Sequence, residues 1–464
     1  MDSISPKLSV KAVTDWLAGH GLSVESRSYS GETLTVRVPA ACANAILAAN
    51  FTAYMHDATN TTMIRTLSYS LPAYLYDHVS FVYPTTQFDA PVRLGAALEL
   101  SLRQSRPRAP SRRADSASEV PASCASSITP RCLQALYGIP TMPATSSGNS
   151  LYVSGLGGTS ANPNDLQTFL EQFRPDIKNG TYTSLSVAGS SDTGIPTNEG
   201  NCDTQYTVGL ATNVSVTYAI AGSMSNGVTF GDLLNTVVYL LELDEPPLVV
   251  TTSYVFDEPV DSESIQVART LCNYYAQLGL LGTSVIFASG DNGAVGGGSN
   301  QNNGCQSPAP FVPSFPSTCP FVTSVGSTQG VNPEVAASFS SGGFSNIFSR
   351  PSYQDTAVNA FLHRQGNLNA GLFNISGRAY PDVATQGMNF NIRVGGLTYN
   401  DFNGTSASSP TFASIIDRLL AAGRSPLGFL NPLLYSNATV AFNDITAGDN
   451  RDSMCGAGFN AEIG

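Results

Sequence analysis

Short apolar runs alternate with helical patterns over most of the chain beyond residue 128. The runs at 248–252 and 284–288 have the length and β-branched content of strands buried on both faces. Between them, residues 262–279 predict a helix. Upstream, 151–153 predicts another strand, followed by a helix capped at Asn164. This rhythm predicts an α/β fold with a parallel sheet covered by helices on both faces.

The first hundred or so residues follow a different pattern. Residues 7–102 form a separate unit, in which apolar side chains at helical spacing between 10 and 17 predict a helix. Alternation over 34–38 predicts a strand. A second helix is expected over 42–50 and a second strand over 79–83. These elements predict a small α+β unit that precedes the larger domain.

A segment of different composition separates the two units. It combines Ser, Pro and Ala with five arginines: Arg103, Arg106, Arg108, Arg112 and Arg113. Such a segment cannot bury a core and is accessible to proteases. A plain tether fits this composition, but we favour a processing site between a propeptide and an enzyme. The expected organisation is a prodomain over 1–102, a linker over 103–127 and a catalytic domain over 128–464.

Composition and charge narrow the class of protein. The 464 residues carry a net charge of -12 with a pI near 4.7, which argues against nucleic acid as a partner. No apolar stretch reaches the ~20 residues of a membrane span. Only 12% of residues are charged, which suits a secreted protein, although the start of the chain does not resemble a signal peptide. A monomer is expected. Sequons for N-glycosylation occur at Asn50, Asn60, Asn179, Asn213, Asn374, Asn403 and Asn437.

Eight cysteines are present, and none of them forms a C-x-x-C pair of the zinc-binding type. Cys124 and Cys132 bracket a short loop, as do Cys305 and Cys319. Both pairs are expected to be disulfides, with a set of buried free thiols as the alternative. Disulfides would place the protein in an oxidising compartment.

A candidate nucleophile lies near the C-terminus, in Gly404-Thr405-Ser406-Ala407. An apolar pattern of helical spacing follows it, and Pro410 is expected in the first helical turn, where a missing N–H costs little. This arrangement would present the Ser406 hydroxyl at a helix N-terminus, where backbone N–H groups favour a developing negative charge.

The proton acceptor for that serine has two candidates. His363 is the only histidine after the linker, and the residues around it suggest a structural role. Glu199 and Asp203 have the i, i+4 spacing that places both carboxyls on one helix face, where they can share a proton. Asp291, in a glycine-flanked turn after the 284–288 strand, is a candidate donor to an oxyanion.

These motifs together resemble the sedolisins, a family of serine-carboxyl peptidases that includes the tripeptidyl peptidases. The resemblance rests on Glu199-x-x-x-Asp203, Ser289-Gly290-Asp291 and Gly404-Thr405-Ser406-x-x-x-Pro410, in the family's order. It is supported by Tyr83-Pro84-Thr85-Thr86 in the first unit and by Arg378-Ala-Tyr-Pro-Asp-Val383. It implies a subtilisin-like sheet and a prodomain that inhibits the enzyme by covering the active site until acid triggers cleavage in the linker.

The resemblance also implies roles for individual residues. Ser406 would be the nucleophile and Glu199 the general base and acid. Asp203 would orient Glu199, and Asp291 would stabilise the oxyanion together with the N–H of Ser406. Because protonated carboxyls are needed, activity would depend on acid. The expected substrates are peptides and proteins, with release of N-terminal tripeptides favoured over an endopeptidase activity or an inactive binding protein.

The family's calcium site has partial counterparts here. The resemblance implies one Ca²⁺ ion held by Asp444, Ile445, Glu462 and Gly464, without a closing aspartate, because the chain ends at Gly464. Val255 stands where the family usually has a glycine next to the substrate backbone, and it is expected to narrow the cleft or to change specificity. Gly200, inside the Glu199–Asp203 helix, is expected to weaken that helix by ~1 kcal/mol.

Overall fold

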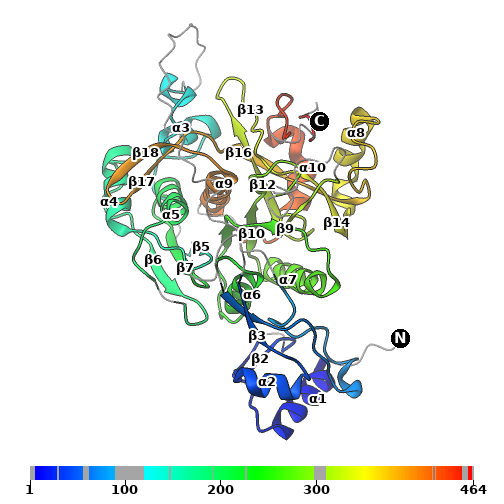
Figure 1. Ribbon diagram of the computed structural model, residues 1–464. Coiled ribbons are helices and arrows are strands. Elements are labelled where there is room, and N and C mark those ends of the chain that lie inside the picture. The colour runs from blue at the N-terminus through cyan, green and yellow to red at the C-terminus, as the bar shows by residue number, and fades with distance from the viewer. Residues whose placement is uncertain are drawn as a thin grey trace.

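A twisted, mostly parallel sheet forms the centre of the molecule (Figure 1). The computed structural model describes residues 6–28, 31–55, 62–88, 120–145, 148–190, 192–224, 227–296, 310–420, 422–423, 425–451 and 458–461. The strands run in the order β6–β7–β5–β8–β10–β12, all parallel, with β16 parallel and β13 antiparallel to β12. Their bounds are β5 Ser150–Gly155, β6 Thr183–Ser186, β7 Ser215–Ile220, β8 Val249–Thr252, β10 Ser284–Ala288, β12 Thr323–Gln329, β13 Val335–Ala336 and β16 Val383–Gln386.

Two layers of helices bury the two faces of this sheet. Alternate residues of each strand enter separate cores: Val249 joins one core, and its neighbour Val250 joins the other. The first core contains α4, α5 and α9, and the second contains α6 and α7. These helices span Pro163–Phe173 (α4), Asn198–Leu210 (α5), Phe230–Leu241 (α6), Ser262–Leu280 (α7) and Thr405–Leu420 (α9). The predicted layered α/β fold is confirmed.

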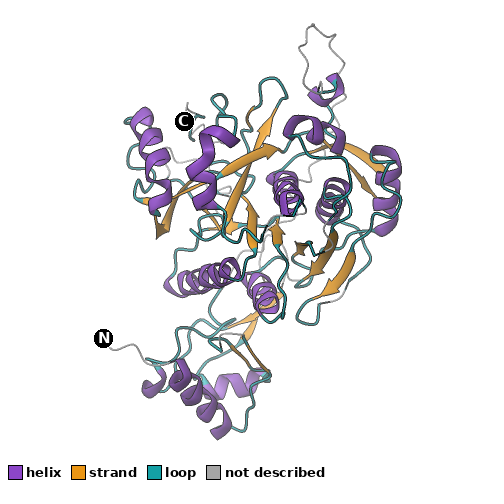
Figure 2. Ribbon diagram, turned by 180° about the vertical axis from the view of Figure 1, so that it is seen from behind, coloured by secondary structure: helices purple, strands orange, loops and turns teal. Residues whose placement is uncertain are grey.

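The remaining elements surround this centre (Figure 2). They are α3 Pro130–Tyr137, β9 Phe256–Asp257, β11 Ser314–Phe315, β14 Gly343–Ser349, α8 Asp355–Gln365, β15 Gly377–Tyr380, β17 Phe390–Val394, β18 Leu397–Phe402 and α10 Asn431–Ala441, with short 3-10 helices at Ala73–Leu75, Ala122–Ala125 and Ser352–Gln354. Strands β17 and β18 form an antiparallel hairpin that leads directly into α9. No helix in the described ranges is long and apolar enough to cross a membrane.

Several predicted boundaries shift in the structure. Helix α4 is capped by Asn162, whose Oδ1 accepts from the N–H groups of Asn164 and Asp165, so the predicted cap at Asn164 was wrong by two residues. Pro163 marks this start, since proline is favoured at the first helical position. Val120 and Cys124, assigned to the linker by sequence, pack against the first core. The expected linker residues 103–119 lie outside the described part of the chain.

The N-terminal unit is small and rests against α6 and α7 (Figure 1). It contains α1 Pro6–Gly19, α2 Ala40–Ile46 and two antiparallel hairpins, Ser26–Arg27 with Leu34–Thr35 (β1, β2) and Thr52–Met55 with Thr62–Arg65 (β3, β4). The strand predicted over 79–83 is absent. These residues form an irregular segment that faces α6 and α7. Phe81 and Tyr83 of this segment pack against the second core of the neighbouring domain.

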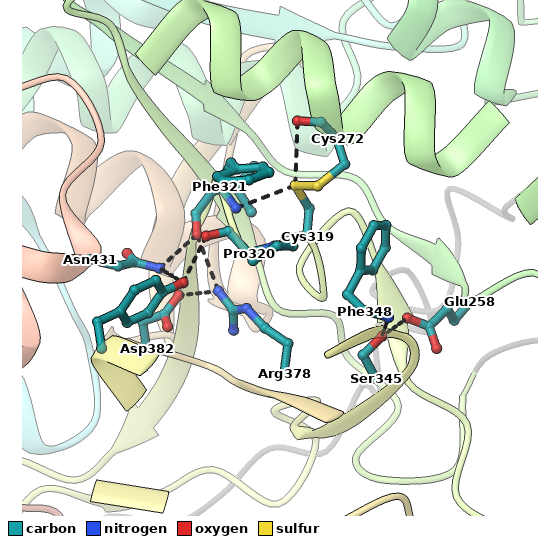
Figure 3. Close-up of a disulfide and its surroundings, with 12 residues drawn as sticks. Glu258, Cys272, Cys319, Pro320, Phe321, Ser345, Phe348, Arg378, Asp382 and Asn431 are labelled. Atoms are coloured by element: carbon teal, nitrogen blue, oxygen red, sulfur yellow. Dashed lines mark hydrogen bonds and ion pairs between the residues drawn. A yellow bond between two sulfur atoms is a disulfide. The ribbon is translucent and has the colours of Figure 1, made fainter. Parts of the chain in front are cut away.

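One predicted disulfide is confirmed and the other is wrong. Cys124 pairs with Cys132, as the short loop suggested. Cys319, however, pairs with Cys272, which lies on the buried face of α7 (Figure 3). Cys305 lies outside the described residues. Loop length favoured a local partner, but the fold packs α7 directly over the turn that carries Cys319. Cys42 and Cys202 are free thiols.

Candidate active site

Two carboxyls lie on the same face of α5. Thr197 caps this helix by accepting from the N–H of Gly200, and Glu199 and Asp203 follow one turn apart. Asp203 is fully buried. Oε1 of Glu199 and Oδ2 of Asp203 are buried without a hydrogen-bond partner among the described residues. Unpaired buried carboxyl oxygens are rare, and they mark this helix face as a place where protons can be exchanged.

Ser406 is the second residue of α9, and its hydroxyl donates to the carbonyl oxygen of Ser253 at 3.4 Å. Pro410 lies inside the helix, so the prediction that it falls in the first turn was wrong. Because Pro410 has no N–H, the carbonyl of Ser406 lacks its usual partner four residues on. Ser253 Oγ lies 3.4 Å from that carbonyl oxygen, at the long end of hydrogen-bond distance.

Ser253 also reaches the acid pair. Its hydroxyl donates to Oδ1 of Asp203 at 2.9 Å, a shorter contact than the one to Ser406. Ser253 follows the last residue of β8, at the carboxyl end of the sheet, where ligand sites of α/β folds lie. The residue therefore connects the helix that carries the carboxyls with the helix that carries Ser406.

Asp291 follows β10 and meets the start of α9. Its Oδ1 accepts from the N–H of Thr405 at 2.7 Å and from Oγ1 of Thr405 at 2.8 Å. The carboxyl thus caps α9 from another part of the chain. Oδ2 lies only 3.0 Å from a Cβ placed on Gly404, so a side chain at that position would crowd it. Because Oδ1 of Asp291 already accepts two hydrogen bonds, Oδ2 is the oxygen of this carboxyl that can carry a proton.

The electrostatics of the site favour neutral carboxyls. Burial raises the pKa of Glu199 well above its usual value, and the negative charges of Asp203 and Asp291 raise it further. Hydrogen bonding with the hydroxyls of Ser406 and Ser253 acts in the opposite direction. Burial likewise raises the pKa of Asp203 well above its usual value and raises the pKa of Asp291. The cluster therefore holds protons at pH values where exposed carboxyls have lost them.

Gly200 allows α5 to approach the sheet closely. A Cβ on this residue would lie 2.5 Å from the carbonyl oxygen of Ser160 and 2.7 Å from the hydroxyl oxygen of Tyr218. The sequence suggested a weakened helix at this glycine. The structure shows that any larger residue would push the acid pair away from its neighbours.

The histidine candidate lies elsewhere. His363 is exposed in the last turn of α8, and in both ribbon views α8 is separated from α9 (Figures 1 and 2). Ser406, by contrast, is only 5% exposed and interacts with Glu199. The structure thus brings together Ser406, Glu199, Asp203 and Asp291 and leaves His363 out.

Comparison with known proteins identifies the family. The model for the pro-kumamolisin activation domain matches residues 1–88. Tripeptidyl-peptidase SED2 of Arthroderma otae is 36% identical over 474 residues, which cover 97% of this chain and 78% of that protein. Tripeptidyl-peptidase SED3 of the same organism is 35% identical over 494 residues, covering 100% of this chain and 78% of that protein. The chain belongs to the sedolisin family.

This sedolisin is therefore a serine-carboxyl peptidase made as a zymogen, with an activation domain at its N-terminus. Its fold agrees with a solved structure, Pseudomonas sedolisin complexed with two molecules of pseudo-iodotyrostatin. The two superpose with a TM-score of 0.59 at 21% identity, over 73% of this chain and 93% of that chain. The predicted subtilisin-like architecture and activation prodomain are confirmed.

Sequence reasoning gave Ser253 no role, although its neighbour Val255 was recognised as unusual for the family. Val255 is half-buried, and its Cγ2 lies 3.0 Å from a Cβ placed on Gly290, directly before Asp291. The signal for Ser253 was its position at the end of the buried 248–252 run. That a cleft is narrowed by Val255 stays a prediction.

The expected calcium ligands are only partly described. Asp444 is exposed and Ile445 is half-buried in the loop after α10, while Glu462 and Gly464 lie outside the described residues. Within the described ranges, no group of three or more His, Cys, Asp or Glu side chains could hold a metal ion. The calcium site therefore stays a prediction, and no step of the chemistry below depends on it.

Proposed function

We propose that this sedolisin hydrolyses peptide bonds in acid with Ser406 as the nucleophile and Glu199 as the general base, and that it releases tripeptides from N-termini. The observation that carries the proposal is that Ser253 contacts both Asp203 and Ser406, which brings the helix face with Asp203 and Glu199 to the serine. Hydrogen bonding with Ser406 as a cause of the Glu199 pKa shift supports it. The tripeptide product is inferred from relatives that are named tripeptidyl-peptidases.

In the first step, Glu199 takes the proton of Ser406 Oγ as that oxygen attacks the carbonyl carbon of the scissile bond. Negative charge then develops on the carbonyl oxygen of the substrate. A protonated Asp291, through Oδ2, and the N–H of Ser406 donate to it, since first-turn N–H groups have no intrahelical partner. Glu199 then returns its proton to the leaving amine, which leaves an acyl group on Ser406.

Hydrolysis of the acyl-enzyme repeats these roles with water as the nucleophile. Glu199 accepts a proton from water, the hydroxide adds to the acyl carbon, and the proton returns to Ser406 Oγ as the acid product leaves. Asp203 shares the negative charge with Glu199, and Ser253 holds Asp203 in place. Burial raises the pKa values of all three carboxyls, which favours a neutral Asp291 and a shared proton on the pair in acid and so supports an acid optimum.

The activation domain is the proposed inhibitor. Its described residues bind α6 and α7, on the sheet face opposite α5 and α9, through contacts that include Tyr69 to Glu263 and Tyr83 to Gly231. The expected cover over the active site is therefore not made by this docking surface. The activation domain would inhibit the enzyme until cleavage in the linker expected over 103–127 releases it.

Two further properties belong to the proposal. The two disulfides support an oxidising, extracellular location. Calcium bound at Asp444 and the Ile445 carbonyl would stabilise the loop after α10. A rise in the thermal unfolding temperature on adding Ca²⁺, lost in Asp444→Ala, would support this site, and an unchanged temperature would argue against it.

The test is mass analysis of products from one long peptide incubated with the acid-activated chain at ~pH 4. Successive loss of three N-terminal residues is the expected result, and Ser406→Ala should release nothing. Internal fragments would indicate the endopeptidase. An unchanged peptide in the presence of the folded wild-type chain would contradict the proposal and favour an inactive binding protein.

A further inference from the structure

The catalytic helix α5 is buried on all sides. Every residue from Gly200 to Leu210 is buried, and polar residues such as Asn201 and Gln205 are as inaccessible as the apolar ones. A helix usually takes its rotation about its own axis from a stripe of apolar side chains. Without such a stripe, hydrophobic burial does not decide which face of α5 turns toward Ser406.

Directional hydrogen bonds on the opposite face can decide it. Asn201 and Gln205 each lie two residues beyond one of the two carboxyls, which places them about 200° around the helix. Nδ2 of Asn201 and Nε2 of Gln205 both donate to the carbonyl oxygen of Arg393 at 2.7 Å. Oε1 of Gln205 accepts from the N–H of Arg393 at 2.9 Å. The helix is thereby tied to strand β17.

Asp165 on α4 completes this attachment. Its Oδ2 accepts from Nδ2 of Asn201 at 2.9 Å and from the N–H of Gly395 at 2.8 Å, and its Oδ1 accepts from the N–H of Gly396 at 2.8 Å. The side chain is only 4% exposed. Three donors converge on it, so a carboxylate suits the position and an amide does not.

The turn that Asp165 holds belongs to the hairpin that delivers the nucleophile. Gly395 and Gly396 both have positive φ, 59° and 81°, and form the two-residue connection between β17 and β18. Strand β18 ends at Phe402, and Ser406 follows four residues later. One carboxylate therefore binds both the helix that carries the acids and the hairpin that leads to the serine.

We propose that Asp165 is a positioning residue that sets the rotation of α5, so that Glu199 and Asp203 face Ser406. The inference rests on the function proposed above and deepens it. Asp165 contacts neither substrate nor the reacting atoms. It acts through Asn201 on one side and through the Gly395–Gly396 turn on the other.

The test compares Asp165→Asn with wild type after acid activation of the full chain. The side-chain amide at position 165 can accept with only one oxygen, and its NH₂ group would face one of the donors that bind Asp165 in wild type. We expect kcat to fall about ten- to hundredfold with KM within about twofold, because small misplacements of catalytic groups have effects of this size. The pH profile of kcat should shift too, since the surroundings of Glu199 change. Glu171→Gln, an exposed change on the same helix, is the matched control.

Unchanged kcat and an unchanged pH profile in folded Asp165→Asn would overturn the inference. A KM change alone would overturn it as well. If Asp165→Asn does not fold, Gln205→Met removes only the bonds to Arg393 and should show the same pattern at smaller size. If wild type itself cleaves nothing, the proposed function fails, and crystal structures decide the inference. A Glu199 carboxyl moved away from Ser406 Oγ in Asp165→Asn supports it, and an unmoved one overturns it.

Discussion

The hydroxyl of Ser253 donates to Oδ1 of Asp203 at 2.9 Å. This bond favours the ionised form of Asp203, and hydrogen bonding with Ser253 also lowers the pKa of Glu199, so Ser253→Ala should raise both pKa values. The acid limb of the kcat profile is expected to move to higher pH, with a rate near pH 4 lowered about tenfold. Ser154→Ala, at a buried serine of β5, is the control, and a profile identical to wild type would refute the role of Ser253.

Gly200→Ala tests the close approach of α5 to the sheet. Alanine favours helices by ~1 kcal/mol over glycine, yet its Cβ would lie 2.5 Å from a backbone oxygen of Ser160. We expect a net loss of unfolding free energy of at least about 2 kcal/mol, because a backbone atom cannot move aside cheaply. Denaturant unfolding of the inactive Ser406→Ala chain measures this difference. Equal or greater stability in the alanine variant would show that α5 has room to shift.

The buried carboxyl of Asp417 is expected to make the free energy of unfolding depend on pH. It is buried on α9, neither of its carboxyl oxygens has a hydrogen-bond partner in the described part of the chain, and burial raises its pKa to about 7. The folded pKa exceeds the unfolded value of ~3.9, so the folded state holds this proton more tightly than the unfolded state. The resulting contribution to the free energy of unfolding is fully present below about pH 4 and is lost as pH rises through about 7.

Asp417→Asn removes this titration. The difference in unfolding free energy between pH 4 and pH 7.5 should shrink by about 3 kcal/mol relative to wild type. Denaturant titrations at both pH values in the Ser406→Ala background give this number. Asp244→Asn, at an exposed site, should leave the difference unchanged. A pH dependence that survives in Asp417→Asn would assign the effect to other carboxyls.

Glu263 is expected to anchor the activation domain to α7. Its carboxyl, in the first turn of α7, accepts from the hydroxyls of Tyr69, Thr85 and Thr86. Glu263→Gln replaces one acceptor oxygen by a donor, so the zymogen should process several-fold faster in acid, and its unfolding temperature should fall. The processed enzyme should be unaffected. Glu245→Gln, which is exposed, is the control, and equal processing rates would exclude Glu263 as an anchor.

The sequence predicted the elements that are defined by local patterns. Strand β10 and helix α7 matched their apolar periodicity, and the i, i+4 spacing placed Glu199 and Asp203 on one helix face. The proximity of these acids to Ser406 followed from motifs recognised as a family resemblance. Periodicity alone would have left their helix face as an ordinary acidic surface.

The features that could not be predicted from the sequence depend on contacts between distant segments of the chain. Cys272 pairs with Cys319 because α7 crosses over that turn, and loop length favoured the nearer Cys305. Sequence reasoning assigned no role to Asp165, whose carboxylate accepts from the N–H groups of a hairpin turn more than two hundred positions away. Pro410 looked like a helix start, although it lies within α9, where the freed Ser406 carbonyl meets Ser253.

Glu199→Gln provides the most direct test of the claim that a carboxyl performs the proton transfer of this peptidase. The pH profile of kcat/KM should be recorded for Glu199→Gln, His363→Ala and wild type with one peptide substrate. We predict a loss of about a hundredfold or more in Glu199→Gln at every pH, with His363→Ala indistinguishable from wild type. Full activity in folded Glu199→Gln, or its loss in folded His363→Ala, would contradict the account.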